Sequence, residues 1–216
     1  PNFHKLQELL PKLGQIRMVQ ANYSQYSSRY DKYLEGTVLP AFDPQLSGGA
    51  LYDINIYNLN LIIGLFGAPN NLIYQARKGF NGIDTSGVVL MSYPEFQALA
   101  IGAKDSDSPS NCLIQGEKGW LKVETAPNQL EKIACQIRGE DNIQEYALNQ
   151  YPHRLSHEFA AFAAMLANKD FAGRDLYLNI SLQVAEAAEK SRKQADISFL
   201  ADQYLRSVPV GTKCPE

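Results

Sequence analysis

The hydrophobic pattern of the chain changes period several times. Leucines at helical spacing predict a helix over residues 1–13, which a glycine ends. Alternating apolar positions predict a strand over 15–25. A polar, tyrosine-rich stretch at 26–36 and a turn-rich stretch at 40–47 are interpreted as loops. The next apolar stretch, 49–66, again has the period of a helix.

The middle of the chain has the period of strands. Six strands are predicted, at 71–80, 87–93, 96–103, 111–114, 119–124 and 131–137. Short turns join them, among them Asn81-Gly82 and the hairpin at 116–119. Consecutive strands joined by short turns cannot be parallel, because parallel strands need long crossovers. We therefore expect one large antiparallel or mixed sheet.

Two further helices are predicted, at 153–168 and 174–193. Their apolar positions are Phe159, Phe162, Ala163 and Leu166 in the first, and Leu178, Leu182, Ala185 and Ala188 in the second. Helices before, between and after a run of antiparallel strands indicate an α+β fold, with the helices layered on one sheet face. We expect residues 1–216 to form a single domain. Because the strands carry apolar residues at both alternating positions, we expect a symmetric dimer to cover the second face.

The composition is that of an ordinary globular protein, with 45% hydrophobic residues and a formal net charge of −3. The 20 Lys and Arg residues are scattered among 23 Asp and Glu residues, which makes nucleic acid a poor candidate partner. No apolar run is long enough to span a membrane, and no signal peptide is recognisable. Cys112, Cys135 and Cys214 form neither a metal pattern nor a disulfide framework. We expect a cytoplasmic protein with small buried thiols and no metal site.

The first residues already have the pattern of a helix in progress, without an initiating Met. The expectation is a fragment of a longer protein.

The candidate chemistry is on the helix at 49–66. A Gly-Gly step leads into it, and Asp53 and Tyr57 are four residues apart, so that both lie on one helix face and can point into one cleft. Ile54 and Leu61 would face the core. A phenol is protonated at neutral pH and suits the role of a proton donor. The alternative is an ordinary hydrogen-bonded pair on a half-buried helix.

Other candidates are less specific. Tyr26 and Arg29 lie in the tyrosine-rich stretch, which is either the wall of a sugar site or a surface loop with aromatic packing. Asn60 and His153 complete the set of candidate substrate-binding residues. His153 precedes a helix, where a capping or surface role is the alternative, and no second ligand at metal spacing accompanies it.

The stretch Gly48-Gly49-Ala50-Leu51-Tyr52-Asp53-Ile54, followed by Tyr57 and by Leu65-Phe66-Gly67-x-Pro69, resembles the hallmark helix of the glucose-fructose oxidoreductase, inositol dehydrogenase and MocA family (Gfo/Idh/MocA). The stretch Ile114–Val123 resembles the family's strand-turn-strand unit, and Glu158-Phe159-x-x-Phe162 its penultimate helix. The resemblance covers essentially the whole chain. The sequence departs from the family pattern at position 55, where Asn55 stands in place of the common Gly. We expect the Asn55 side chain to lie near the cleft.

The resemblance implies the C-terminal, substrate-binding and dimerising domain of an oxidoreductase that uses NAD or NADP on a sugar, polyol or related alcohol. An N-terminal Rossmann domain would bind the cofactor and supply a lysine, because this chain has no G-x-G-x-x-G motif after a strand. Tyr57 would then transfer the proton, and Asp53 would orient Tyr57 or a substrate hydroxyl. The chain alone is expected to be inactive. The rival hypothesis is a non-catalytic binding or scaffold domain that has kept the family fold.

Overall fold

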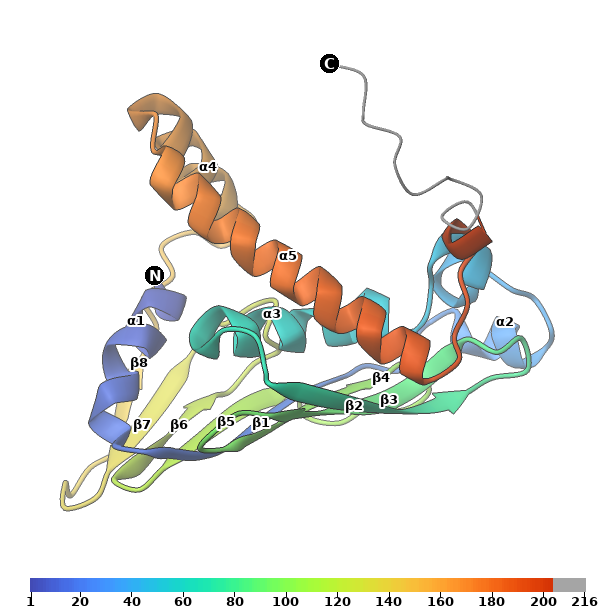
Figure 1. The fold of residues 1–216 in the computed structure, drawn as a ribbon. Coiled ribbons are helices and arrows are strands. Elements are labelled where there is room, and N and C mark those ends of the chain that lie inside the picture. Colours follow the sequence, from blue (N-terminus) through green and yellow to red (C-terminus); the bar gives the residue numbers. More distant parts are fainter. Residues whose placement is uncertain (204–216) are drawn as a thin grey trace.

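The computed structural model describes residues 1–203, which form one eight-stranded sheet with helices on one face (Figure 1). The strand order is β2-β3-β4-β1-β5-β6-β7-β8, and every neighbouring pair except β1 and β4 is antiparallel. The α+β class and the large mixed sheet predicted from the sequence are therefore confirmed. None of the helices described is long and apolar enough to cross a membrane.

The strands are β1 (Ile16–Ser24), β2 (Asn71–Lys78), β3 (Asp84–Ser92), β4 (Gln97–Ala103), β5 (Asn111–Gly116), β6 (Gly119–Val123), β7 (Ile133–Ile137) and β8 (Gln144–Tyr146). The α-helices are α1 (Asn2–Leu9), α2 (Tyr30–Leu34), α3 (Ile56–Phe66), α4 (Ser156–Asn168) and α5 (Phe171–Gln194). A 3₁₀ turn, Leu10–Leu13, follows α1, and two more, Pro40–Phe42 and Pro44–Leu46, precede the π-turn Leu51–Asn55 that leads into α3.

The parallel pair β1 and β4 lies at the middle of the sheet. After β1 the chain crosses over through α2 and α3 to the sheet edge at β2, and the hairpins β2-β3-β4 bring it back beside β1. Ser24 is paired with Ala103, so both strands end at the same edge. The backbone contacts continue past this edge, because Ser27 N–H donates to Lys104 O at 2.9 Å. The segments that follow β1 and β4 consequently lie together.

The register of the sheet separates a covered face from an open one. A row of paired residues is buried across seven strands: Leu72, Met91, Ala98, Val19, Ile114, Leu121 and Cys135. The next row, on the opposite face, contains Ile73, Leu90 and Leu99, of which Ile73 is 48% exposed. Apolar residues therefore occupy both faces, as the sequence predicted, but the described helices cover only one (Figure 1).

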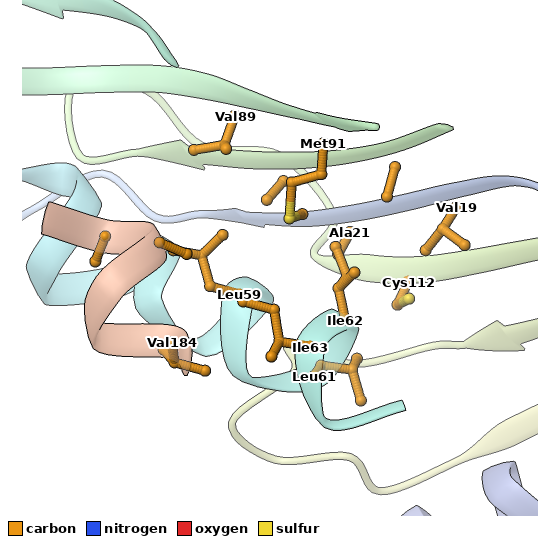
Figure 2. Packing of buried hydrophobic residues seen from close by; sticks show 14 of the residues in the cluster. Val19, Ala21, Leu59, Leu61, Ile62, Ile63, Val89, Met91, Cys112 and Val184 are labelled. Atoms are coloured by element: carbon orange, nitrogen blue, oxygen red, sulfur yellow. The ribbon is translucent and has the colours of Figure 1, made fainter. Parts of the chain in front are cut away.

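Helix α3 packs its apolar side on the covered face. Leu59, Ile62 and Ile63 are fully or almost fully buried, between the central strands and Val184 of α5 (Figure 2). Burial of each such side chain contributes roughly 1.5–3 kcal/mol relative to its exposure to water. This packing fixes α3, and with it the segment before α3, against the sheet.

Three elements differ from the sequence prediction. Helix α2 lies within a stretch interpreted as loop, because Tyr33 is buried and stacks on Phe42 and Phe80. Strand β8 extends the sheet edge beyond the six predicted strands and β1. The helix predicted over 49–66 is not uniform, since its first turn, Leu51–Asn55, is a π-helix.

The last two helices are layered on the sheet only in part. Helix α4 and the first half of α5 form a hairpin that projects away from the sheet (Figure 1). Phe159, Phe162 and Leu166 are 68%, 52% and 80% exposed, and Leu178 and Leu182 are each 55% exposed. Core packing of α5 comes instead from Val184, Ala187 and Ala188 near its C-terminal end.

The C-terminal end of α5 is held by a charged pair. Arg192, almost fully buried, donates two hydrogen bonds to Asp202 at 2.6 and 2.7 Å and one to Ile197 O at 2.9 Å. The guanidinium lowers the pKa of the Asp202 carboxyl to about 2. Of the predicted buried thiols, Cys112 and Cys135 are buried and free, whereas Cys214 lies outside the described residues.

The Arg192–Asp202 pair predicts a pH-dependent contribution to stability. A carboxyl whose pKa is lower when folded stabilises the fold above the unfolded pKa, near 3.9, and this stabilisation is lost as the pH falls through about 2. At pH 7, Asp202→Asn should lower the free energy of unfolding by roughly 1–3 kcal/mol. Urea titrations of both proteins between pH 7 and pH 2 check this: the difference should shrink towards pH 2. A constant difference would contradict the role of the charge.

Candidate active site

The π-turn Leu51–Asn55 is held at its start by a buried carboxylate. Asp84 of β3 accepts hydrogen bonds from Leu51 N–H at 2.6 Å and from the Tyr74 hydroxyl at 2.7 Å. Burial raises the pKa of Asp84, and these hydrogen bonds oppose that shift. Gly49 allows this close approach, because its φ is +101° and a Cβ there would lie 2.1 Å from Asp84 Oδ1.

Two asparagines fix the same turn to the central strand β4. Asn55 donates to Ala100 O at 3.1 Å, and Asn58 donates to Ile101 O at 2.8 Å and to the Asn55 side chain at 2.7 Å. Gly102 leaves room for this contact, since a Cβ there would lie 2.6 Å from Asn55 Cβ. The prediction that Asn55 lies near the cleft is therefore wrong: the side chain is 1% exposed and bonded to the sheet.

Asp53 is on the outer side of the π-turn and forms an ion pair with a buried lysine. Lys104 Nζ lies 2.6 Å from Asp53 Oδ2, and the side chains are 2% and 49% exposed. Lys104 follows the last residue of β4, so the parallel β1–β4 pair brings it beneath Asp53. Burial lowers the pKa of Lys104, and the hydrogen bond to Asp53 opposes this shift.

Asp53, Tyr57 and Lys104 line one pocket of about 310 Å³. The other walls come from the end of β1 and the segment after it, from the π-turn, from Asn128 and from the segment before α4. They consist of Tyr23, Gln25, Tyr26, Ser27, Ser28, Arg29, Ile54, Asn128 and Arg154. The Tyr57 ring lies 5.9 Å from the Tyr23 ring, and Asn128 donates to the Tyr23 hydroxyl at 3.3 Å. Hydroxyl, amide and charged groups therefore converge there, a lining that fits a small polyhydroxy compound.

The structure brings four of the six candidate residues together. Asp53, Tyr57, Tyr26 and Arg29 all line the pocket, where the Tyr26 hydroxyl donates to Asp31 at 2.6 Å. The pair Asp53 and Tyr57 lies on the exposed side of its helix, as one-face spacing predicts, although no hydrogen bond joins them in the described structure.

Two candidates lie elsewhere. Asn60 is exposed, donates to Ile56 O at 2.8 Å within its own helix and is not among the pocket residues. His153 lines a different pocket of about 460 Å³ and accepts a local hydrogen bond from Leu155 N–H at 3.3 Å, in the exposed turn before α4. Its neighbour Arg154 reaches both pockets.

Sequence reasoning missed Lys104 and Arg154. The available signal for Lys104 was a single lysine directly after an apolar strand, but its partner is 51 positions away and only the fold brings the two together. Within residues 1–203, no cluster of three or more His, Cys, Asp or Glu side chains could hold a metal ion.

Residues 3–122 match the family model described as the GFO/IDH/MocA C-terminal domain. The chain is 34% identical over 203 residues to a scyllo-inositol 2-dehydrogenase (NADP(+)), IolU of Bacillus subtilis, covering 94% of this chain and 61% of that protein. It is 35% identical over 204 residues to the uncharacterized oxidoreductase YgjR of Escherichia coli, covering 94% and 60%. The chain thus spans about three fifths of these curated relatives.

Solved structures share the fold at low sequence identity. KijD10, a 3-ketoreductase from Actinomadura kijaniata in complex with NADP and TDP-benzene, has a TM-score of 0.69 at 18% identity, covering 88% of this chain and 58% of that one. An aldose-aldose oxidoreductase from Caulobacter crescentus, complexed with glycerol, has a TM-score of 0.67 at 18% identity, covering 89% and 58%. Each of these two proteins is longer than this chain, which covers 58% of its length.

The contact between Gly49 and Asp84 predicts a large effect of one methyl group. Gly49→Ala should lower the free energy of unfolding by about 1–2 kcal/mol, because alanine is strained at a positive φ. It should lower it by roughly 1–3 kcal/mol more, because the displaced Asp84 loses hydrogen bonds. Gly36→Ala is the matched control, since Gly36 has a φ of +89° and no atom near its Cβ position. Denaturant unfolding measures both variants. Equal losses would show that the Asp84 contact contributes nothing.

Proposed function

This chain belongs to the GFO/IDH/MocA family of oxidoreductases, and we propose that it is the substrate-binding and dimerisation domain of an NAD(P)-dependent enzyme. The substrate in this proposal is a sugar, polyol or related alcohol or carbonyl compound, and the reaction is hydride transfer. The observation that carries the proposal is the pocket shared by Asp53 and Tyr57, with polar walls from three distant segments. The name of the similar B. subtilis enzyme, which acts on scyllo-inositol with NADP, supports the same class.

Tyr57 is the residue for proton transfer in this proposal. Oxidation of an alcohol releases a proton as the hydride leaves, and the reverse reaction needs a donor at the new alkoxide. The phenol of Tyr57 lines the pocket and is 36% exposed, so a substrate oxygen can reach it. Asp53 binds a substrate hydroxyl rather than orienting Tyr57, because one of its oxygens is engaged by Lys104.

The cofactor requires residues beyond those described. NAD or NADP would accept or supply the hydride. The chain contains no strand followed by G-x-G-x-x-G, and so it lacks the phosphate-binding turn that this type of cofactor needs. The pocket residues fit a substrate and not a dinucleotide. We therefore assign the cofactor to an upstream domain of the parent protein and expect the 216-residue chain alone to show no turnover with NADH or NADPH.

The α4–α5 hairpin supports the proposal of a further domain. An apolar groove of about 880 Å³ runs between these helices, lined by Phe162, Leu166, Phe171, Tyr177 and Leu178 among others. Large apolar side chains gathered on one exposed groove, with Phe162 52%, Leu166 80% and Phe171 60% exposed, suit an interaction site. Near the N-terminus, the Asn2 side chain accepts a hydrogen bond at 2.9 Å from Leu148 N–H, in the segment that leads to α4. A domain that precedes Pro1 in the parent protein is well placed to cover the groove.

The open sheet face is the proposed dimer interface. Ile73, Leu90 and Leu99 are paired across three strands on this face, and no described element covers them. A two-fold axis through the face would bury the same apolar row from both copies. In this proposal the cytoplasmic parent protein is a homodimer or a higher homo-oligomer.

The rival function is a binding or scaffold domain without catalysis. It retains the fold and the dimer, and it predicts that substitutions at Asp53 and Tyr57 are tolerated. The buried Lys104 beneath Asp53 favours the catalytic reading, because a buried charge is costly to keep where only binding between domains is required.

Tyr57→Phe in the full-length parent protein tests the proton-transfer role. Loss of a general acid–base group typically costs 10²–10⁴ in rate, which corresponds to about 3–5 kcal/mol of transition-state stabilisation. We expect this loss in kcat for scyllo-inositol and NADP⁺. Tyr146→Phe, which also removes a phenolic hydroxyl but on the distant strand β8, is the matched control and should keep full activity. A loss below about fivefold for Tyr57→Phe would refute the assignment.

Leu90→Lys tests the dimer. A lysine at this position places a charge at the centre of the apolar row Ile73, Leu90 and Leu99, which should shift the parent protein to monomers in sedimentation-velocity experiments. Burial of an unpaired charge at an interface costs several kcal/mol, enough to dissociate a micromolar dimer. Glu95→Lys, in the exposed turn before β4, is the control that should leave the dimer intact. If Leu90→Lys remains dimeric, the interface lies elsewhere.

A further inference from the structure

Lys104 is the one fully buried lysine side chain among the described residues, and it is held from several directions. Its Nζ donates to Ala41 O at 2.5 Å and lies 4.3 Å from the centre of the Phe42 ring. Its backbone N–H donates to Thr85 O at 2.8 Å, and its carbonyl accepts from Ser27 N–H. The lysine head is therefore fixed by the fold, independently of any ligand.

The remaining partner of Lys104 is the candidate catalytic carboxylate. Asp53 Oδ2 lies 2.6 Å from Nζ, while Asp53 Oδ1 has no hydrogen-bond partner among the described residues. Half of the Asp53 side chain is exposed, in the pocket that also contains Tyr57. One carboxylate oxygen is thus anchored from below, and the other is free for a ligand.

Lys104 borders the pocket, but its side chain is only 2% exposed and its Nζ is already bonded to Ala41 O and to Asp53, so Asp53 is the group that presents itself to a substrate. We propose that Lys104 is a positioning residue, which fixes the Asp53 carboxylate so that its second oxygen accepts a hydrogen bond from a substrate hydroxyl. This inference rests on the proposed function of the pocket. It assigns a lysine of this chain to the site, in addition to any group that another domain supplies.

The charges around Lys104 act in opposite directions. Arg29 lines the same pocket, and its positive charge acts against that of Lys104. Asp84, buried on the other side, attracts Lys104 but is bonded to Leu51 and Tyr74. Without the lysine, nothing beneath Asp53 would hold it against rotation toward Arg29 or solvent. Displacement of a substrate-binding group by about 1 Å can cost 10²-fold in rate.

The test is a double-mutant cycle in the full-length parent protein with scyllo-inositol and NADP⁺ as the probe. Lys104→Met, Asp53→Asn and the double variant are compared by kcat and KM. We expect Lys104→Met to lose about 10–10²-fold in kcat/KM, and the double variant to match Asp53→Asn within about twofold, since Lys104 acts only through Asp53. Lys132→Met, which breaks a surface pair with Glu124 and Glu145, is the control for loss of a lysine.

A purely structural role of Lys104 gives a different result. Lys104→Met would then lower kcat/KM by the same factor in the wild-type protein and in the Asp53→Asn variant. The two losses would multiply in the double variant, and this outcome would overturn the proposal. Lys104→Gln, which keeps a donor for Ala41 O, is the second variant if Lys104→Met does not fold. Circular dichroism establishes that each variant is folded at the assay temperature.

A crystallographic comparison separates this inference from the proposed function. In crystals of the Lys104→Met parent protein, Asp53 should leave its position while Ala41 and Phe42 stay in place. If Asp53 keeps its position, the inference is wrong, whether or not the enzyme is active. If the wild-type protein fails to oxidise any sugar or polyol but Asp53 moves, the positioning is real and the proposed function is wrong.

Discussion

The parallel pairing of β1 with β4 is the constraint on which the rest of the structure depends. It forces both strands to end at the same edge of the sheet, where Ser24 faces Ala103. The loop after β1 and the lysine after β4 therefore leave the sheet side by side, beneath the start of the helix that joins the two halves of the sheet. Ligand sites in open sheets form beyond the carboxyl ends of parallel strands for this geometric reason. Among the eight strands within residues 1–203, only β1 and β4 form a parallel pair and so supply such an edge.

Local pattern predicted those features that depend on a few consecutive residues. The period-two stretches gave seven of the strands, and the spacing of Asp53 and Tyr57 gave their common exposure. Strand β8 escaped because three polar residues carry no period of their own and are ordered by pairing with β7. The π-turn escaped because it is held by a tertiary contact: Leu51 N–H donates to Asp84, far along the chain.

The site was predictable only as far as it is local. Lys104 and Arg154 join it through tertiary structure: the partner of Lys104 is 51 positions away, and it was the neighbour of Arg154, His153, whose chemistry drew attention. His153 and Asn60 had suitable chemistry and unsuitable positions: His153 bonds within the exposed turn before α4, and Asn60 bonds to its own helix. Asn55 shows the converse, since a polar residue in place of the usual glycine serves to bond β4 and not a ligand. Residue type indicated chemistry, but only the fold determined which groups face one another.

Helix α5 is a single element with two environments. It is 24 residues long, which corresponds to about 36 Å, with its first half in the projecting hairpin and its second half packed on α3 and the sheet. An unbroken helix is stiff, so the hairpin cannot tilt without displacing Val184 and Ala188 in the core. A tilt of the hairpin would therefore also shift the half of α5 that packs on α3. A domain bound to the hairpin is in this way mechanically coupled to the helix that carries Tyr57.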